Sequence, residues 1–271
     1  MKYTKIESLG TLFLLFSLPT LPQDTPAFVQ RVADRAAGLD ADRVLFLTPS
    51  LTADLRLDAY TREGSRIPEA DCLPALGAYL FFVAGLPLYA YRIETREGTL
   101  PLEISRSEPP LFRCFYEKSK LLFAKTQIFC KNTDGILYVN EAGVRCAFLL
   151  CDSAENADLP ALLHAVSFSE TEAVRSVLAL SPRTGGYEVR CLTVSGEVCP
   201  PLSALVALCR LPALPKGGVL SATELFLPRG RVRIERGRGG ALSLLVPARL
   251  LARGEYAGVL SEKNGKKTRE K

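Results

Sequence analysis

ADCLPALGAYL at residues 70–80 and EVCPPLSALV at residues 197–206 follow one pattern, which occurs once in each half of the chain. In each segment a cysteine, Cys72 or Cys199, is followed within two residues by a proline and then by a run of small and apolar residues. Proline fits the first turn of a helix, where its missing N–H would be unpaired, so each cysteine is expected at the start of a helix. The positive end of a helix favours a thiolate. The pattern therefore suggests a two-thiol proton-transfer site between the two halves.

The rest of the sequence repeats one order of elements in both halves. Strand-like runs surround each of the two apolar segments, and further helices are predicted at residues 25–37 and 159–166. Segments 73–84 and 202–211 have no polar face, which predicts helices that are buried on every side. We therefore expect an α+β fold with two pseudo-symmetric domains, each a curved mixed sheet around a central buried helix.

The domain boundary is expected near residue 117. The N-terminal half would comprise residues 1–117 and the C-terminal half residues 118–261, with a last strand that can return to the first half. A chain of 271 residues, 48% of them hydrophobic, is long enough to build two such cores. Residues 262–271 (EKNGKKTREK) are polar and mostly basic, which predicts a disordered tail.

The eight cysteines do not form a metal-binding pattern. Cys146 and Cys151 are too far apart for a zinc knuckle, and the single histidine, His164, leaves zinc without a ligand set, so we expect no metal. Cysteines inside apolar runs are typical of buried free thiols in a reducing cytosol, which favours a cytoplasmic protein. The apolar run at residues 12–18 is interpreted as a strand with a hairpin partner. A signal peptide, and hence a secreted protein, is the alternative.

The charge pattern does not favour a nucleic acid or a membrane as partner. The net charge is +5, and part of it comes from the basic tail. In residues 229–238 the basic residues alternate with apolar ones and no aromatic residue stands among them, which indicates a strand with a solvated face rather than a nucleic-acid site. The apolar run at residues 12–18 is too short to span a bilayer.

Five segments, in order from residue 1 to about residue 257, resemble the motifs of one known family. MKYTKIESLGTLF at the start resembles M-x-F-x-K-M-x-G-L-G-N-D-F, and DRAAGLDADRVL at residues 34–45 resembles D-R-H-x-G-I-G-A-D-G-V-L. LDAYTREGS at residues 57–65, followed by Cys72, resembles R-x-x-N-x-D-G-S followed by M-C-G-N-G. SGEVC at residues 195–199 resembles part of G-x-G-E-T-x-A-C-G-T-G-A, and VPARLLARG at residues 246–254 resembles G-P-A-x-x-V-F-x-G. The chain thus resembles diaminopimelate epimerase.

The resemblance implies an isomerase that needs no cofactor and converts LL- to meso-diaminopimelate in lysine biosynthesis. One cysteine thiolate would remove the proton from the α-carbon and a second thiol, on the opposite face, would return one. Cys72 and Cys199 would be this catalytic pair. The implied substrate-binding residues are Thr11, Gly64, Ser65, Arg175, Gly196 and Glu197. The implied partners are a small amino acid and a second copy of the chain in a homodimer.

The sequence departs from these motifs around both cysteines. The glycine turns of the family, which hold the substrate carboxylate with backbone N–H groups, read CLPA at residues 72–75 and CPPL at residues 199–202. Proline has no N–H to donate. The motif histidine is Ala36, and a match without gaps would place Pro201, rather than Cys199, at the second catalytic position.

These departures support a second hypothesis, a non-catalytic paralogue that acts as a binding or regulatory protein. Under this hypothesis Cys72 and Cys199 are buried structural thiols, and Arg175 is an exposed arginine on a strand. The pairs Gly64-Ser65 and Gly196-Glu197 then serve only the turns in which they stand.

Overall fold

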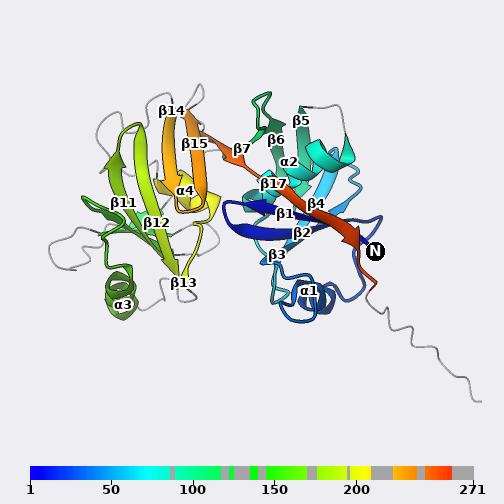
Figure 1. The fold of residues 1–271 in the computed structure, drawn as a ribbon, viewed down its shortest axis with the longest axis horizontal. Helices are drawn as coiled ribbons and strands as arrows, with labels where there is room; N and C mark the ends of the chain where they lie inside the picture. Colours follow the sequence, from blue (N-terminus) through cyan, green and yellow to red (C-terminus); the bar gives the residue numbers. More distant parts are fainter. Residues whose placement is uncertain are drawn as a thin grey trace, which may run out of the picture.

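The computed structural model describes residues 1–85, 89–116, 122–124, 135–139, 145–169, 176–193, 196–208, 222–236 and 242–257. The protein consists of two halves that lie side by side (Figure 1). The first half contains β1 (Lys2–Ser8), β2 (Thr11–Ser17), α1 (Thr25–Ala33), β3 (Arg43–Thr48), β4 (Leu55–Thr61), η1 (Glu69–Cys72), α2 (Leu73–Tyr79), η2 (Leu80–Ala84), β5 (Ala90–Thr95), β6 (Gly98–Ile104) and β7 (Leu111–Tyr116). The second contains β8 (Leu122–Ala124), β9 (Gly135–Val139), β10 (Arg145–Leu150), α3 (Leu159–Ser169), β11 (Ser176–Arg183), β12 (Gly186–Thr193), β13 (Gly196–Glu197), α4 (Leu202–Leu208), β14 (Ala222–Leu227), β15 (Gly230–Arg236) and β16 (Leu242–Pro247). The last strand, β17 (Arg249–Glu255), returns to the first half, where it pairs with β1.

The two halves share one strand topology. From β1 to β7 the successive pairings are antiparallel, parallel, antiparallel, parallel, antiparallel and antiparallel. From β9 to β16, with β13 left aside, the pairings follow the same series. The parallel pairs need crossover connections, and helices supply them at equivalent places: α1 and α3 at the first crossover, and α2 and α4 at the second. The α+β fold with pseudo-symmetric halves is therefore confirmed.

Hydrogen bonds join the two curved sheets into one continuous network. Strand β7 of the first half pairs with β16 of the second, in the register Phe112↔Val246. Because the chain leaves the first half along β7 and comes back along β16 and β17, the two sheets meet at these strands (Figure 1). The predicted order of strands and helices holds within each half, but the junction between the two sheets depends on pairing between distant segments.

Each half encloses its own apolar core around one helix. Helix α2 contributes Leu73 and Leu76 to a cluster with strands of the first half, and α4 contributes Leu202 and Leu205 to a separate cluster in the second half. Helices α1 and α3 each belong to a further cluster, formed with β2–β4 and with β10–β11. The central position of α2 and α4 agrees with the absence of a polar face in their sequences.

The end of the first central helix differs from the sequence prediction. The segment predicted as one buried helix over 73–84 is an α-helix only to Tyr79, and a π-helical turn, η2, follows it. Phe81 and Phe82 of this turn are each 42% exposed and contact one another edge to face. Apolar residues near the end of the segment therefore reach the surface, because the wider turn rotates them out of the core. Gly85, with φ of 60°, ends the helix in the left-handed conformation.

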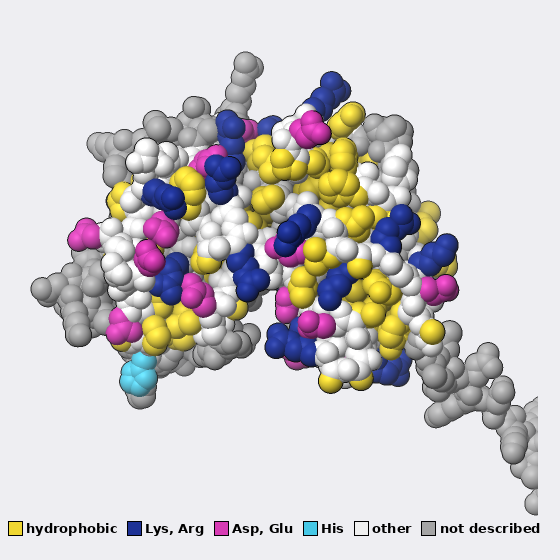
Figure 2. Space-filling model, in the orientation of Figure 1, with side chains coloured by type: hydrophobic (Ala, Val, Ile, Leu, Met, Phe, Trp, Pro, Cys, Tyr) yellow, Lys and Arg dark blue, Asp and Glu magenta, His cyan; other side chains and the backbone are white. Residues whose placement is uncertain are grey.

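Among the residues that the structure describes, no helix is long and apolar enough to cross a membrane. On the face drawn in Figure 2, lysine and arginine side chains lie interspersed with aspartate and glutamate over both halves. The residues around the basic segment form the hairpin of β14 and β15, as the alternation of charged and apolar residues indicates.

Candidate active site

Cys72 and Cys199 occupy equivalent places in the two halves. Cys72 ends η1 and directly precedes α2, on the crossover between the parallel strands β4 and β5. Cys199 lies between β13 and α4, on the crossover between the parallel strands β12 and β14. The topology therefore brings the two cysteine-bearing helix starts to matching positions, as the repeated sequence pattern suggests.

The Cys72 sulfur lies against the side chain of Arg43. Cys72 is completely buried in the core of the first half. Arg43 begins β3, and its Nη1 lies 3.8 Å from the Cys72 Sγ. The guanidinium also lies over the ring of Phe13 on the neighbouring strand β2, 5.7 Å from the ring centre. Arg43 thus places a permanent positive charge beside one thiol of the candidate pair.

Cys199 lines a small pocket between the two halves, together with Arg43. Thr11 and Asp71 come to this pocket from the first half, and Pro200 and Pro201 come from the second. The cavity volume is about 20 Å³. A site of that size holds a single water molecule, not an amino acid. Cys72 is absent from the described lining, because the Arg43 side chain lies against its sulfur.

Both thiols carry a proton at neutral pH. Burial raises the pKa of Cys72 to about 11, although the charge of Arg43 acts in the opposite direction. Burial likewise raises the pKa of Cys199 to about 12, against the same opposing effect of Arg43. The negative charge of Asp71 adds to the rise at both sulfurs. The expectation that a helix start would favour the thiolate is therefore wrong here, because burial outweighs the local field.

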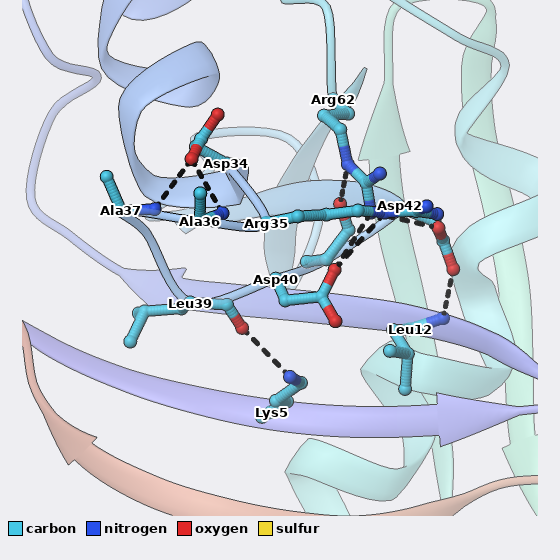
Figure 3. A network of polar contacts seen from close by, with 11 residues as sticks. Lys5, Leu12, Asp34, Arg35, Ala36, Ala37, Leu39, Asp40, Asp42 and Arg62 are labelled. Atoms are coloured by element: carbon cyan, nitrogen blue, oxygen red, sulfur yellow. Dashed lines mark hydrogen bonds and ion pairs between the residues drawn. The ribbon is translucent and has the colours of Figure 1, made fainter.

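A polar network fixes the loop that leads into Arg43. Asp34 accepts hydrogen bonds from the backbone N–H groups of Ala36 and Ala37, at 2.8 and 2.7 Å (Figure 3). Arg62 reaches from beyond the end of β4 to the carboxylates of Asp40 and Asp42. The other oxygen of that second carboxylate accepts the N–H of Leu12, as Figure 3 shows. These contacts hold residue 43 next to the start of β2, where Thr11 stands.

Thr11 is the only residue proposed for substrate binding in the first half that the pocket includes. Gly64 lies in the turn after β4 with φ of 82°, and its N–H donates to the carbonyl of Thr61. An added Cβ at this glycine would come within 2.9 Å of the Pro26 carbonyl oxygen, so the position requires glycine for its turn. Ser65 is exposed, and its carbonyl closes the same turn.

The corresponding pair in the second half forms the short strand β13, which pairs with the end of β12. Gly196 has φ of 117° and its carbonyl accepts the Thr193 hydroxyl hydrogen bond. Glu197 forms a two-pronged ion pair with Arg190, with N–O distances of 2.8 and 3.1 Å. The Glu197 side chain is therefore paired with Arg190 of β12 and does not belong to the described pocket lining. Arg175 lies outside the described residues.

The motifs of the sequence do not point to Arg43 and Asp71, the charged residues of the pocket lining. A signal was present for each. Arg43 stands where the motif D-R-H-x-G-I-G-A-D-G-V-L has its last glycine, so a long charged side chain occupies a position that has no side chain in the motif. Asp71 is a charge directly before the cysteine that opens an apolar helix. A charged group beside a buried helix indicates a specific partner.

The described residues contain no cluster of three or more histidine, cysteine or acidic side chains that could hold a metal ion. The six cysteines in the described part of the chain are free thiols. Cys130 and Cys209 lie outside it.

Comparisons with known proteins agree with this fold. A diaminopimelate epimerase from Desulforudis audaxviator is 34% identical over 109 residues, a segment that covers 38% of this chain and 38% of that protein. The chain resembles diaminopimelate epimerase. The match spans little more than a third of that relative's length, and no protein-family model matches the sequence.

Solved structures extend the diaminopimelate-epimerase-like fold to almost the whole chain. A phenazine biosynthesis protein of the PhzF family from Enterococcus faecalis superposes with a TM-score of 0.67 at 16% identity, over 94% of this chain and 98% of that one. A hydroxyproline epimerase from Agrobacterium vitis, solved with bound trans-4-hydroxy-L-proline, gives a TM-score of 0.65 at 13% identity, over 94% and 90%. At these identities the structures show the fold, and the sequence similarity supports an epimerase or isomerase type.

Proposed function

We propose that this chain is a non-catalytic relative of the two-cysteine amino-acid epimerases. The observation that carries the proposal is the position of Arg43, whose guanidinium lies 3.8 Å from the Cys72 sulfur and lines the same 20 Å³ pocket as Cys199. In the motif that the sequence resembles, glycine leaves this space open. Here Arg43 stands at that position, and the pocket that remains beside Cys199 holds about 20 Å³, too little for an amino acid.

The chemistry of α-proton transfer supports this conclusion. The reaction needs a thiolate on one face of the α-carbon and a thiol on the other, and preorganised N–H donors for the developing negative charge. At Cys72 and Cys199 the raised pKa values leave only a very small thiolate fraction at neutral pH. Pro200 and Pro201 have no N–H to donate. Loss of one such donor typically costs a factor of about 10² to 10³ in rate, so the combined losses leave little activity.

A two-cysteine isomerase is the second candidate, and one observation favours it. Arg43 lowers the pKa of both thiols relative to what burial alone would give, as a residue that assists a thiolate would do. The similarity to diaminopimelate epimerase then supports conversion of LL- to meso-diaminopimelate in lysine biosynthesis, in the cytoplasm and without a cofactor. The amino acid bound to the hydroxyproline epimerase supports a smaller amino acid as the alternative substrate.

Deuterium exchange at the α-carbon distinguishes the two candidates. The purified chain is incubated in D₂O with LL-diaminopimelate, and separately with L-proline and trans-4-hydroxy-L-proline, and α-deuteration is followed by mass spectrometry. We expect no exchange above that of the Cys72→Ala and Cys199→Ala variants. Robust exchange in the unmodified chain, lost in both cysteine variants, would establish the isomerase and refute the non-catalytic proposal.

A folded relative without catalysis acts through what it binds. We propose that its partner is a protein, either a second copy of this chain or an active epimerase, and that neither a nucleic acid nor a membrane is involved. The interspersed charges in Figure 2 support this choice. Sedimentation velocity of the chain alone, and mixed with an active diaminopimelate epimerase, measures both associations.

A further inference from the structure

One carboxylate crosses from the first half of the protein to the second. Asp71 belongs to η1, and its Oδ1 accepts a hydrogen bond of 3.1 Å from the backbone N–H of Ser203 in α4. The N–H of Leu202, the first residue of α4, also stabilises the ionised carboxylate. A side chain of the first half therefore accepts the N–H of Ser203, 132 residues away in the sequence, and also interacts with the N–H of Leu202.

Helix α4 cannot provide this contact from its own sequence. The residue before α4 is Pro201, which has no side-chain oxygen to accept the first N–H groups of the helix. Helix α1 shows the ordinary local solution, in which Asp24 caps its own helix at Ala27. In α4 the acceptor comes from the opposite half, so the cap also holds the halves together.

Arg43 completes the surroundings of this carboxylate. Burial raises the pKa of Asp71, while the charge of Arg43 and the two N–H groups of α4 act against that rise. Asp71, Arg43 and Cys199 line the same pocket. The carboxylate thus faces a cation on the first half and hydrogen-bond donors on the second, directly beside the candidate thiols.

We propose that Asp71 is a clasp that keeps the two halves closed over Cys72 and Cys199. The paired strands β7 and β16 join the halves and serve as the hinge. Release of the Asp71 carboxylate from α4 lets η1 and α4 separate. This widens access to Cys199, which is already partly exposed, and frees η1, whose last residue is the buried Cys72. The proposal goes beyond the catalytic question, because the clasp works in the same way whether or not the thiols transfer protons.

Site-resolved labelling of thiols tests the clasp. The native protein is treated with N-ethylmaleimide at pH 8.5, and labelling at each cysteine is followed by peptide mass spectrometry. Cys114 and Cys191 are fully buried in the cores of the first and second half and serve as internal controls for unfolding. In Asp71→Ala we expect Cys72 and Cys199 to react at least about tenfold faster, with both controls unchanged.

The decisive comparison is Ser203→Pro against Ser203→Ala. Removal of the Asp71 charge would itself ease ionisation of both thiols, whereas Ser203→Pro keeps the charge and removes only the N–H donor. Proline is acceptable at this second position of a helix, since α2 already carries Pro74 there. Ser203→Ala keeps the N–H and should label like the unmodified protein.

Two results would overturn the clasp. The first is that Cys72 and Cys199 in Ser203→Pro are labelled at the same rate as in Ser203→Ala. The second is that the labelling rates of Cys114 and Cys191 increase by the same factor as those of Cys72 and Cys199, because the contact would then stabilise the whole fold rather than close the site. Neither readout depends on epimerase activity, so the clasp and the proposed function can fail separately.

Discussion

Substitution of Arg43 by methionine should make Cys72 still harder to ionise. The change removes the positive charge and keeps a long side chain of similar reach. Two unit charges 3.8 Å apart interact by about 4 kcal/mol at an effective dielectric constant of 20 and by about 2 kcal/mol at 40. Arg43 is partly exposed, so we take these two values as the range of the interaction. At 1.36 kcal/mol per pKa unit, the pKa of Cys72 should rise from about 11 by roughly 1.5 to 3.

Carbon NMR of protein labelled with ¹³C at the cysteine Cβ measures this directly, because the signal shifts when the sulfur ionises. At pH 10.5 a pKa of about 11 gives roughly a quarter thiolate at Cys72, whereas the Arg43→Met variant should show below about 1%. Lysine loses its own charge at about pH 10.4, so Arg43→Lys should titrate between the methionine variant and the unmodified protein. Burial raises the pKa of Cys114 with no arginine acting against that rise, so this thiol should stay protonated throughout. Equal titration of Cys72 in the methionine and unmodified proteins would refute the electrostatic role of Arg43.

Two further predictions concern stability. Glu69 is 2% exposed, and within the described structure neither of its oxygens has a hydrogen-bond partner, so burial raises its pKa above 4.5. The folded protein then keeps a proton that the unfolded chain releases, so its free energy of unfolding should fall, relative to that of Glu69→Gln, as the pH rises from about 4.5 through the folded pKa. The expected fall is about 1.4 kcal/mol for each unit by which the folded pKa exceeds the unfolded one. Urea denaturation at several pH values measures it, and equal pH dependence of the two proteins would contradict the prediction. Gly77→Ala gains about 1 kcal/mol of helix propensity but drives the new Cβ into the Phe112 ring, and the net loss should be about 1 to 3 kcal/mol. Urea denaturation should show this loss, and Phe112→Leu in the same chain should recover part of it; an unchanged midpoint for Gly77→Ala would exclude the clash.

The features that the sequence made predictable are those encoded by local pattern. The apolar runs after Cys72 and Cys199 have no polar face, and a helix of that kind can only be stable inside a core. In the strands around them, polar and apolar residues alternate or the residues are apolar throughout, and this pattern predicts the order of elements in both halves. The end of α2 was less predictable, because Phe81 and Phe82 look like core residues until a π-helical turn rotates them outward.

The chemistry of the site was not predictable from local pattern. The helix start at Cys72 indicated a favoured thiolate, but burial of the sulfur raises its pKa instead. Which side chains meet there depends on contacts between distant segments: 29 residues separate Arg43 from Cys72 and 132 separate Asp71 from Ser203. No spacing rule reports such contacts, although a charge at a motif glycine was a sign that the space had been taken.

The changes around the two cysteines are mutually dependent. Prolines after Cys199 remove N–H donors and leave α4 without a cap of its own, and Asp71 from the other half supplies the missing acceptor. A buried carboxylate between the halves needs a nearby cation, and Arg43 provides it in the space that glycine would leave open. Reversal of one change alone therefore exposes an unpaired charge or an uncapped helix. Under the proposed non-catalytic function, this coupling explains why the equivalent cysteines remain, because the pocket is stabilised by the residues that close it.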